Sequence, residues 1–237
     1  MKTLNGDGQP AIGDATPGTG LVVAQNTALV SGDAFDKVVA SSSFLPRVQL
    51  FGSNSGAVKE DKIGQGRYGL VRDKNSIEDL SQSFNCLPLD WRWKAMQVAD
   101  GAIVSVYDFN SDAFTKLKDT ADNEKDSGCM WGVEFLIWMP DQKEFATFYL
   151  SSATARREAK PMRARTQPEC LPTTLTRELI KKPKYSWFGP KVNACSTPLS
   201  SYPSQEEVNE QVEKFRKSSI ASKAKATGTE GDEGRER

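Results

Sequence analysis

LPLDWRWKAMQVADGAIVSVY, residues 87–107, is the stretch that decides the fold class of this chain. Apolar residues occupy every second position of its first nine residues, and three of the four positions between them are charged; an alternation of period two predicts a half-buried β-strand. The expected apolar face carries Leu87, Leu89, Trp91, Trp93 and Ala95. The expected polar face carries Asp90, Arg92 and Lys94. The dipeptide Asp100-Gly101, which is typical of a tight hairpin turn, leads into a second strand at 102–107.

Further strands are expected on both sides of this hairpin. Apolar and β-branched residues in short runs predict them at 44–51, 131–139, 145–150 and 173–180, with a turn at 140–143. Short helices are expected at 112–121 and 151–160. About six strands with few helices predict a mainly β, β-rich α+β domain. Turns at short spacing favour an OB-like small barrel, closed or half-open, over a parallel α/β sheet.

The two ends of the chain differ from this core in composition. Residues 1–42 are rich in Gly, Ala, Thr and Asp and predict a flexible N-terminal arm, followed by the OB-like core at 43–203. Ser204 is a helix cap by type, and apolar residues spaced by three and four predict a short helix at 204–217. Residues 218–237 are polar and glycine-rich, which predicts a disordered tail.

The chain of 237 residues contains no histidine. This excludes Ser-His-Asp hydrolases, Cys-His proteases and H-E-x-x-H metalloenzymes, so we expect a binding protein rather than an enzyme, with no cofactor. Free thiols are the favoured state of Cys86, Cys129, Cys170 and Cys195. Their wide spacing speaks against a metal site, although a zinc site built from distant loops and structural disulfides both remain open. No apolar run approaches the roughly 20 residues of a membrane-spanning helix, so a non-membrane protein of the cytoplasm is expected.

Two segments resemble sequence motifs of known function. Residues 63–71, IGQGRYGLV, match the glycine-rich phosphate loop of protein kinases, but the H-R-D catalytic loop is absent. We interpret this segment as a hairpin in which glycine supplies a positive φ. Residues 108–119 resemble the start of a calcium loop, yet the sixth place is Ala113 where glycine is needed. A helix N-cap at Ser111 or Asp112 explains that segment better.

A net charge of zero conceals an uneven distribution. Residues 108–144 contain nine acidic and four basic residues, whereas residues 156–191 contain ten basic and three acidic ones. Within the basic part, residues 181–191 read KKPKYSWFGPK, with lysines and aromatic residues interleaved. Single-stranded nucleic acid is held by cations along its phosphates and by aromatic rings on which bases stack, so this segment predicts such a site. The alternatives are a solvated basic surface, and aromatic residues that end a strand in the core.

The predicted nucleic-acid-binding residues fall into three groups. The first is the segment just described, with Lys182, Lys184, Tyr185 and Trp187. The second is the polar face of the long strand, Arg92 and Lys94, with Arg67 and Arg72 expected on a neighbouring strand. The third is Arg156 and Arg157 on the short helix at 151–160. Trp91 and Trp93 are expected to belong to the core.

Several segments together resemble a family of bacteriophage proteins that bind single-stranded DNA on an OB-type barrel. These segments are FLPRVQL (44–50), GCMWGVEF (128–135), FATFY (145–149), SATAR (152–156), KYSW (184–187) and CSTP (195–198). The resemblance implies binding without sequence specificity in phage DNA replication or recombination, in the cytoplasm of the host cell. It also implies recruitment of replication proteins by the C-terminal tail. The last four residues, GRER, alternate in charge and so depart from the acidic tail of such proteins.

Two other function classes compete with this interpretation. A virion structural or decoration protein would also be β-rich with extended arms and without catalytic residues, and an ordered N-terminal arm would favour it. A metal-dependent nuclease would need three converging carboxylates. The acidic residues of 119–126 look more like a surface loop than such a cluster.

Overall fold

A computed structural model describes residues 45–73, 76–99, 102–124, 126–166 and 169–227 of the chain. The arm predicted at 1–42 lies outside the described residues. The expectation that an ordered arm would favour a virion protein therefore concerns residues outside this range. The strands are β1 (Arg47–Leu50), β2 (Tyr68–Asp73), β3 (Ser76–Ser81), β4 (Ser83–Ala99), β5 (Ala102–Val106), β6 (Cys129–Met139), β7 (Glu144–Leu150), β8 (Thr173–Lys181) and β9 (Ser186–Ala194). The helices are α2 (Gly56–Lys59), α3 (Asp112–Asn123), α4 (Ala153–Thr166) and α5 (Gln205–Thr227).

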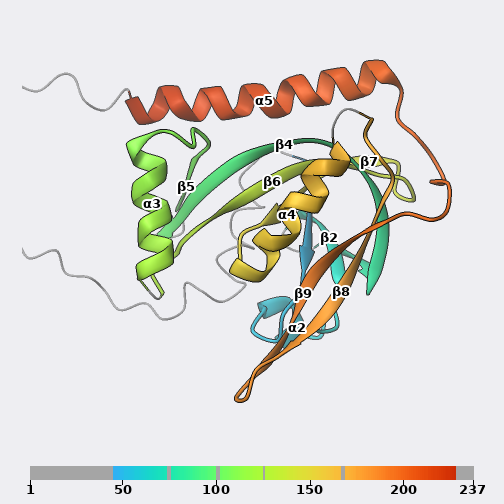
Figure 1. Ribbon diagram of the computed structural model, residues 1–237, viewed down its shortest axis with the longest axis horizontal. Helices are drawn as coiled ribbons and strands as arrows, with labels where there is room; N and C mark the ends of the chain where they lie inside the picture. The colour runs from blue at the N-terminus through green and yellow to red at the C-terminus, as the bar shows by residue number, and fades with distance from the viewer. Residues whose placement is uncertain (1–44, 74–75, 100–101, 125, 167–168, 228–237) are drawn as a thin grey trace, which may run out of the picture.

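The predicted mainly β class with a few helices is confirmed, and the strands form an open, curved sheet (Figure 1). Its order is β3-β2-β1-β7-β6-β4-β8-β9, with β5 paired to β4. β1 runs parallel to β7. The two ends of the sheet contact each other through side chains: the Tyr68 hydroxyl donates to the Thr176 carbonyl at 2.7 Å, and Arg177 donates to the Gly66 carbonyl at 2.9 Å. The observed sheet therefore curls back on itself while remaining open.

The long strand β4 changes its buried face midway, and the predicted single apolar face is wrong. The pairing of β4 with β6 shifts register between Pro88 and Asp90. Proline has no N–H to donate to the sheet, so a bulge at this position is expected. As a result Leu87 and Leu89 pack on the side of Phe215, whereas Trp91 and Trp93 pack with the core on the opposite side. One extra residue was enough to reverse the alternation.

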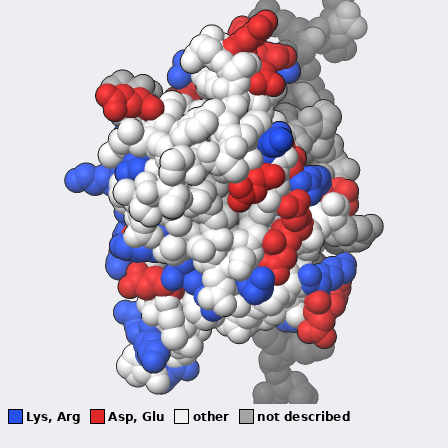
Figure 2. Space-filling view, turned by 90° about the vertical axis from the view of Figure 1, so that its right-hand side faces the viewer, with Lys and Arg blue, Asp and Glu red and all other residues white. Residues whose placement is uncertain are grey.

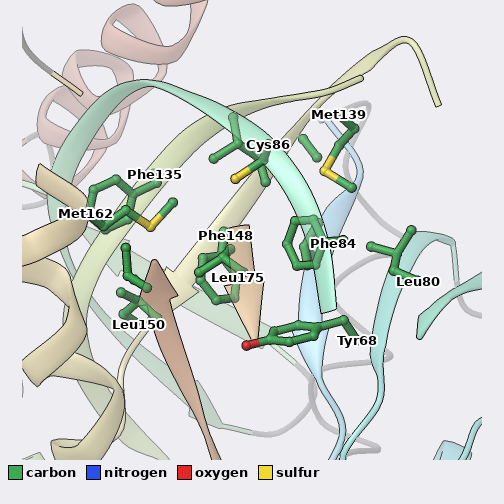
Figure 3. Packing of buried hydrophobic residues seen from close by; sticks show 14 of the residues in the cluster. Tyr68, Leu80, Phe84, Cys86, Phe135, Met139, Phe148, Leu150, Met162 and Leu175 are labelled. Carbon is green, nitrogen blue, oxygen red and sulfur yellow. The ribbon is translucent and has the colours of Figure 1, made fainter. Parts of the chain in front are cut away.

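The main core fills the inner side of the curved sheet (Figure 3). Tyr68, Phe135 and Leu175 come from three strands that are distant in sequence, and none of them is exposed to solvent. Met162 of α4 closes the same cluster. Burying each large apolar side chain contributes roughly 1.5–3 kcal/mol, so this cluster holds the sheet, α4 and the β8–β9 hairpin together.

Helix α5 covers the opposite side of the sheet, lying along β4 in Figure 1. Ser204 and Glu207 form a capping box, in which the Glu207 N–H donates to the Ser204 hydroxyl at 3.2 Å. Phe215 packs against Leu87 and Leu89. The helix extends to Thr227, so the predicted end at 217 and the predicted start of disorder at 218 need correction. The residues after 217 are largely Ala, Ser and Lys, and Ala and Lys are good helix formers.

Two strands were not predicted as such. β3 is mostly polar with weak alternation, and β9 contains Pro190. Proline is accepted in β9 because this strand is the last of the sheet, where one row of backbone groups has no partner among the described strands. No helix in the described ranges is long and apolar enough to cross a membrane.

Candidate nucleic-acid interface

The hairpin of β8 and β9 projects from the sheet, and its tip carries the predicted lysine-aromatic segment. The Lys182 N–H donates to the Tyr185 carbonyl at 2.9 Å and closes the turn. Figure 2 shows basic side chains on the projection at the lower left, at the height where Figure 1 places this tip. Lys181, Lys182 and Lys184 are exposed, and none of them has a carboxylate partner within the part of the chain that the structure describes. These three charges are therefore free to meet an anion.

Tyr185 and Trp187 lie next to these lysines as a stacked pair. Their ring centroids are 5.5 Å apart, with an interplanar angle of 28°. Side chains two residues apart in a strand share a face, which explains the pairing. Tyr185 is 66% exposed and Trp187 is half-buried, and neither belongs to a core cluster. Among the described residues, this pair therefore lies outside the core clusters.

Arg92 and Lys94 do not form an open binding surface. Both pair with the buried Glu134, at 2.5 Å for the Arg92 guanidinium and 2.6 Å for the Lys94 ammonium. The Arg92 guanidinium is also stacked on the rings of Tyr107 and Phe215, each at 4.0 Å. Burial alone would raise the pKa of Glu134, but the charges of Lys94 and Arg92 outweigh it and hold that pKa below its ordinary value. These residues form a structural charge cluster beneath α5.

Arg67 and Arg72 are likewise paired with carboxylates and lie away from Arg92. Arg67 meets Asp79 at 2.5 Å, and Arg72 meets Glu78 at 2.8 Å and also Glu144. Three strands separate β2 from β4 in the sheet order. The predicted joint surface of these four basic residues is therefore not formed.

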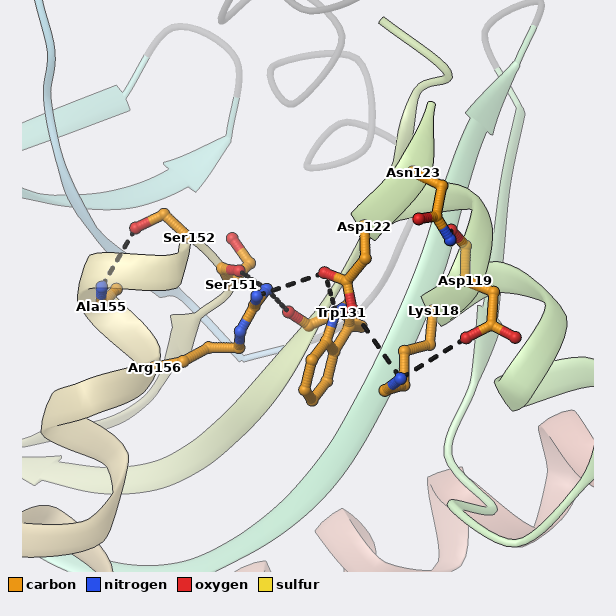
Figure 4. A network of polar contacts seen from close by, with 9 residues as sticks. All are labelled: Lys118, Asp119, Asp122, Asn123, Trp131, Ser151, Ser152, Ala155 and Arg156. Carbon is orange, nitrogen blue, oxygen red and sulfur yellow. Dashed lines mark hydrogen bonds and ion pairs between the residues drawn. The ribbon is translucent and has the colours of Figure 1, made fainter. Parts of the chain in front are cut away.

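Arg156 and Arg157 lie on α4 as expected, but in different surroundings. The Arg156 guanidinium covers the Trp131 ring at 4.1 Å and donates to the Ser151 carbonyl at 2.7 Å (Figure 4). It also pairs with Asp122 of α3 at 3.3 Å. Arg157 is exposed, with no ion pair among the described residues. Of these two arginines, only Arg157 is therefore fully available to bind a phosphate group.

An aromatic cluster that the sequence did not reveal lies beside α4. Trp93 contacts both Phe109 and Trp131, with ring centroids 4.7 Å and 6.1 Å apart. Trp91 contacts Trp93 at 6.2 Å, and the Arg163 guanidinium lies 3.7 Å above the Trp91 ring. One signal was present in the sequence: Arg156, Lys160 and Arg163 are spaced by four and three, which places them on one helical face. The aromatic partners come from β4, β6 and the segment before α3, and local spacing cannot bring these together.

The structure also shows what the calcium-loop-like segment and the glycine-rich segment form. Ser111 caps α3 through a hydrogen bond from the Phe114 N–H at 3.2 Å, as predicted in place of a calcium loop. In the described ranges, no group of three or more His, Cys, Asp or Glu side chains could hold a metal ion. All four cysteines are free thiols. The glycine-rich segment is a turn whose carbonyls at Gln65 and Gly66 accept hydrogen bonds from Arg177.

Gly66→Ala is expected to destabilise the protein without affecting any nucleotide chemistry. Gly66 has a φ of +72°, and an added Cβ would lie 2.2 Å from the Arg177 guanidinium and 2.5 Å from the Phe188 ring. The left-handed backbone alone costs about 1–2 kcal/mol for a residue with a side chain. Thermal unfolding should show the loss, whereas Gly52→Ala, whose Cβ would meet nothing within 4 Å, should melt almost as the wild type does. ATP turnover by the wild-type protein that disappears in Gly66→Ala would refute this interpretation.

Comparisons with known proteins add no family to this picture. No family model matches the chain, and searches of curated proteins and of solved structures gave no match either.

Proposed function

We propose that this chain is a single-stranded-DNA-binding protein of phage DNA replication or recombination, acting in the host cytoplasm. It is a binding protein rather than an enzyme. The observation that carries the proposal is the tip of the β8–β9 hairpin, where three lysines without a carboxylate partner among the described residues adjoin the stacked Tyr185–Trp187 pair in the chain. Cations along a phosphate backbone with aromatic rings for the bases are what binding of single strands without sequence preference requires.

The distribution of ion pairs supports this choice of site. Arg67, Arg72, Arg92 and Lys94 are all neutralised by nearby carboxylates. The lysines at the tip are not paired in this way within the described residues. A zero net charge therefore does not prevent binding to a polyanion, because the local field at the tip remains positive.

The curved sheet also fits this proposal. We interpret it as a variant of the OB-type barrel that has stayed open, a fold class whose small barrels accommodate single strands. The resemblance of the segments between 44 and 198 to phage proteins of this kind points the same way. Replication proteins are the proposed partners.

The direct test is a titration with a fluorescent single-stranded oligonucleotide at several salt concentrations. Lys182→Ala and Lys184→Ala should each weaken binding regardless of base sequence, because each removes one phosphate contact. Each should also flatten the log–log dependence of affinity on salt by about 0.7. The matched control is Lys214→Ala, which removes an exposed lysine of α5 that pairs with Glu210. Its slope should equal that of the wild type.

Two results would contradict the proposal. Absence of salt-dependent binding by the wild-type protein would remove the function itself. Equal slopes for Lys182→Ala, Lys184→Ala and Lys214→Ala would show that binding, if present, does not use the tip.

A further inference from the structure

Helix α4 and the aromatic cluster beside it combine the same two ingredients as the hairpin tip. The cluster consists of Trp91, Trp93, Phe109 and Trp131, and is called the tryptophan cluster below. Its three tryptophans are half-buried and Phe109 is 41% exposed, so part of the cluster faces solvent. In a core built to exclude water, large aromatic residues would be covered more completely.

Basic residues of α4 border this cluster. Arg156 lies above Trp131 and Arg163 above Trp91, with Lys160 between them on the same helical face. Lys160 is exposed. Neither Lys160 nor Arg163 has a carboxylate partner among the described residues, and the one acidic side chain of the helix, Glu158, is taken up by Lys191 and by the Val192 N–H.

The geometry of Arg163 leaves its donors available. A guanidinium stacked on a ring uses its flat face for that contact, while its N–H groups lie in the plane and point outward. A phosphate oxygen can accept from them without displacing the ring. The stacked arginine is thus held in place for an anion and needs no carboxylate to orient it.

We propose that α4 and the tryptophan cluster form a second subsite for the same strand of DNA. Phosphates bind along Lys160 and Arg163, and a base stacks on the exposed part of the cluster around Phe109. This inference rests on the proposed function and extends it, because one strand would then contact both the hairpin tip and α4. Lys160, Arg163 and Phe109 become binding residues in addition to the predicted ones.

The test uses the full chain with Trp187→Phe, so that the tip no longer emits as tryptophan. The tryptophans that remain are those of the cluster and Trp138, which is buried and packs with Phe145. An unlabelled oligothymidine of roughly 16 nucleotides, the upper end of a typical site, should quench this emission as it binds. Affinity and salt slope are measured separately by the anisotropy of a labelled oligonucleotide of the same length.

Lys160→Ala and Arg163→Ala should each flatten the salt slope by about 0.7, and Lys214→Ala should not. Phe109→Ala should weaken binding roughly 5- to 150-fold with an unchanged slope, because stacking releases no counterions. Melting temperatures of all variants are measured alongside, and Lys160→Ala, at an exposed and unpaired position, provides a reading that does not depend on the packing of the cluster.

The outcomes separate this inference from the function that it extends. Binding by the wild-type protein, combined with unquenched cluster emission and wild-type slopes in both Lys160→Ala and Arg163→Ala, would overturn the second subsite and leave the proposed function standing. Absence of any binding by the wild-type protein would overturn both. Quenching together with two flattened slopes would support the subsite.

Discussion

Glu134→Ala is expected to lower the free energy of unfolding by about 3–5 kcal/mol, the cost of leaving buried charge without its partner. Glu134 is 4% exposed and accepts from both Arg92 and Lys94. Its removal leaves two cations facing each other beneath α5 with no anion between them. Urea denaturation at neutral pH measures the loss.

The control is Glu213→Ala, which breaks an exposed pair with Lys217 on α5 and should leave stability almost unchanged. A loss for Glu134→Ala no larger than that of the control would show that the cluster does not stabilise the fold. The cluster would then regain its place as a candidate surface for DNA.

The same cluster predicts a dependence of stability on pH. The pKa of Glu134 in the folded protein lies below its ordinary value, despite burial, because Lys94 and Arg92 stabilise the ionised form. Its contribution is therefore complete above the unfolded-state pKa, about 4.3, and is lost as the pH falls through the lower folded-state value. Glu134→Gln should be less stable than the wild type at neutral pH, and the difference should shrink below about pH 4.

The double variant Tyr185→Ala/Trp187→Ala is expected to lose roughly 2–6 kcal/mol of binding to single-stranded DNA, since each stacked base is worth about 1–3 kcal/mol. The salt slope should stay near that of the wild type, because no phosphate contact is removed. The melting temperature should change little, because Tyr185 is exposed, Trp187 is half-buried, and neither belongs to a core cluster. Anisotropy titrations and thermal unfolding supply the three readings.

Tyr202→Ala is the matched control, since Tyr202 is an aromatic residue of similar exposure, 57%, before α5. It should bind as the wild type does. A double variant with normal affinity and a sharp drop in stability would return the pair to the core, where emptying a buried tryptophan site costs about 3–5 kcal/mol. Normal affinity and normal stability together would assign the pair neither role.

The parts of the molecule that could be predicted are those decided by neighbouring residues. The β6–β7 hairpin and the cap of α3 at Ser111 each depend on a few adjacent positions, and each lies where it was expected. The face reversal of β4 depends on the register with β6, which Pro88 alone does not reveal. Alternation in one strand cannot show a residue that bulges out of the pairing.

Whether a predicted basic residue is already paired with a carboxylate also depends on residues that are distant in sequence. Arg92 meets a carboxylate 42 positions away, and Arg72 meets one 72 positions away, so composition within a segment could not show that these charges are already paired. The lysines of the tip have no carboxylate partner among the described residues because a projecting turn has few neighbours that could neutralise them. The tryptophan cluster escaped notice because its rings come from three separate segments, and only the tertiary fold joins them.

The placement of α5 has a consequence for how the protein is made. α5 follows every strand in chain order, yet it covers Leu87 and Leu89 of β4 and provides Arg216, whose guanidinium meets the buried carboxylate of Asp90 at 2.6 Å. On a ribosome, which adds about 5–20 residues per second, the sheet emerges first. Until α5 has been synthesised, the nascent sheet presents an apolar surface and an unneutralised acid to its surroundings. When α5 packs onto the sheet, it therefore covers this apolar surface and neutralises this acid in a single step.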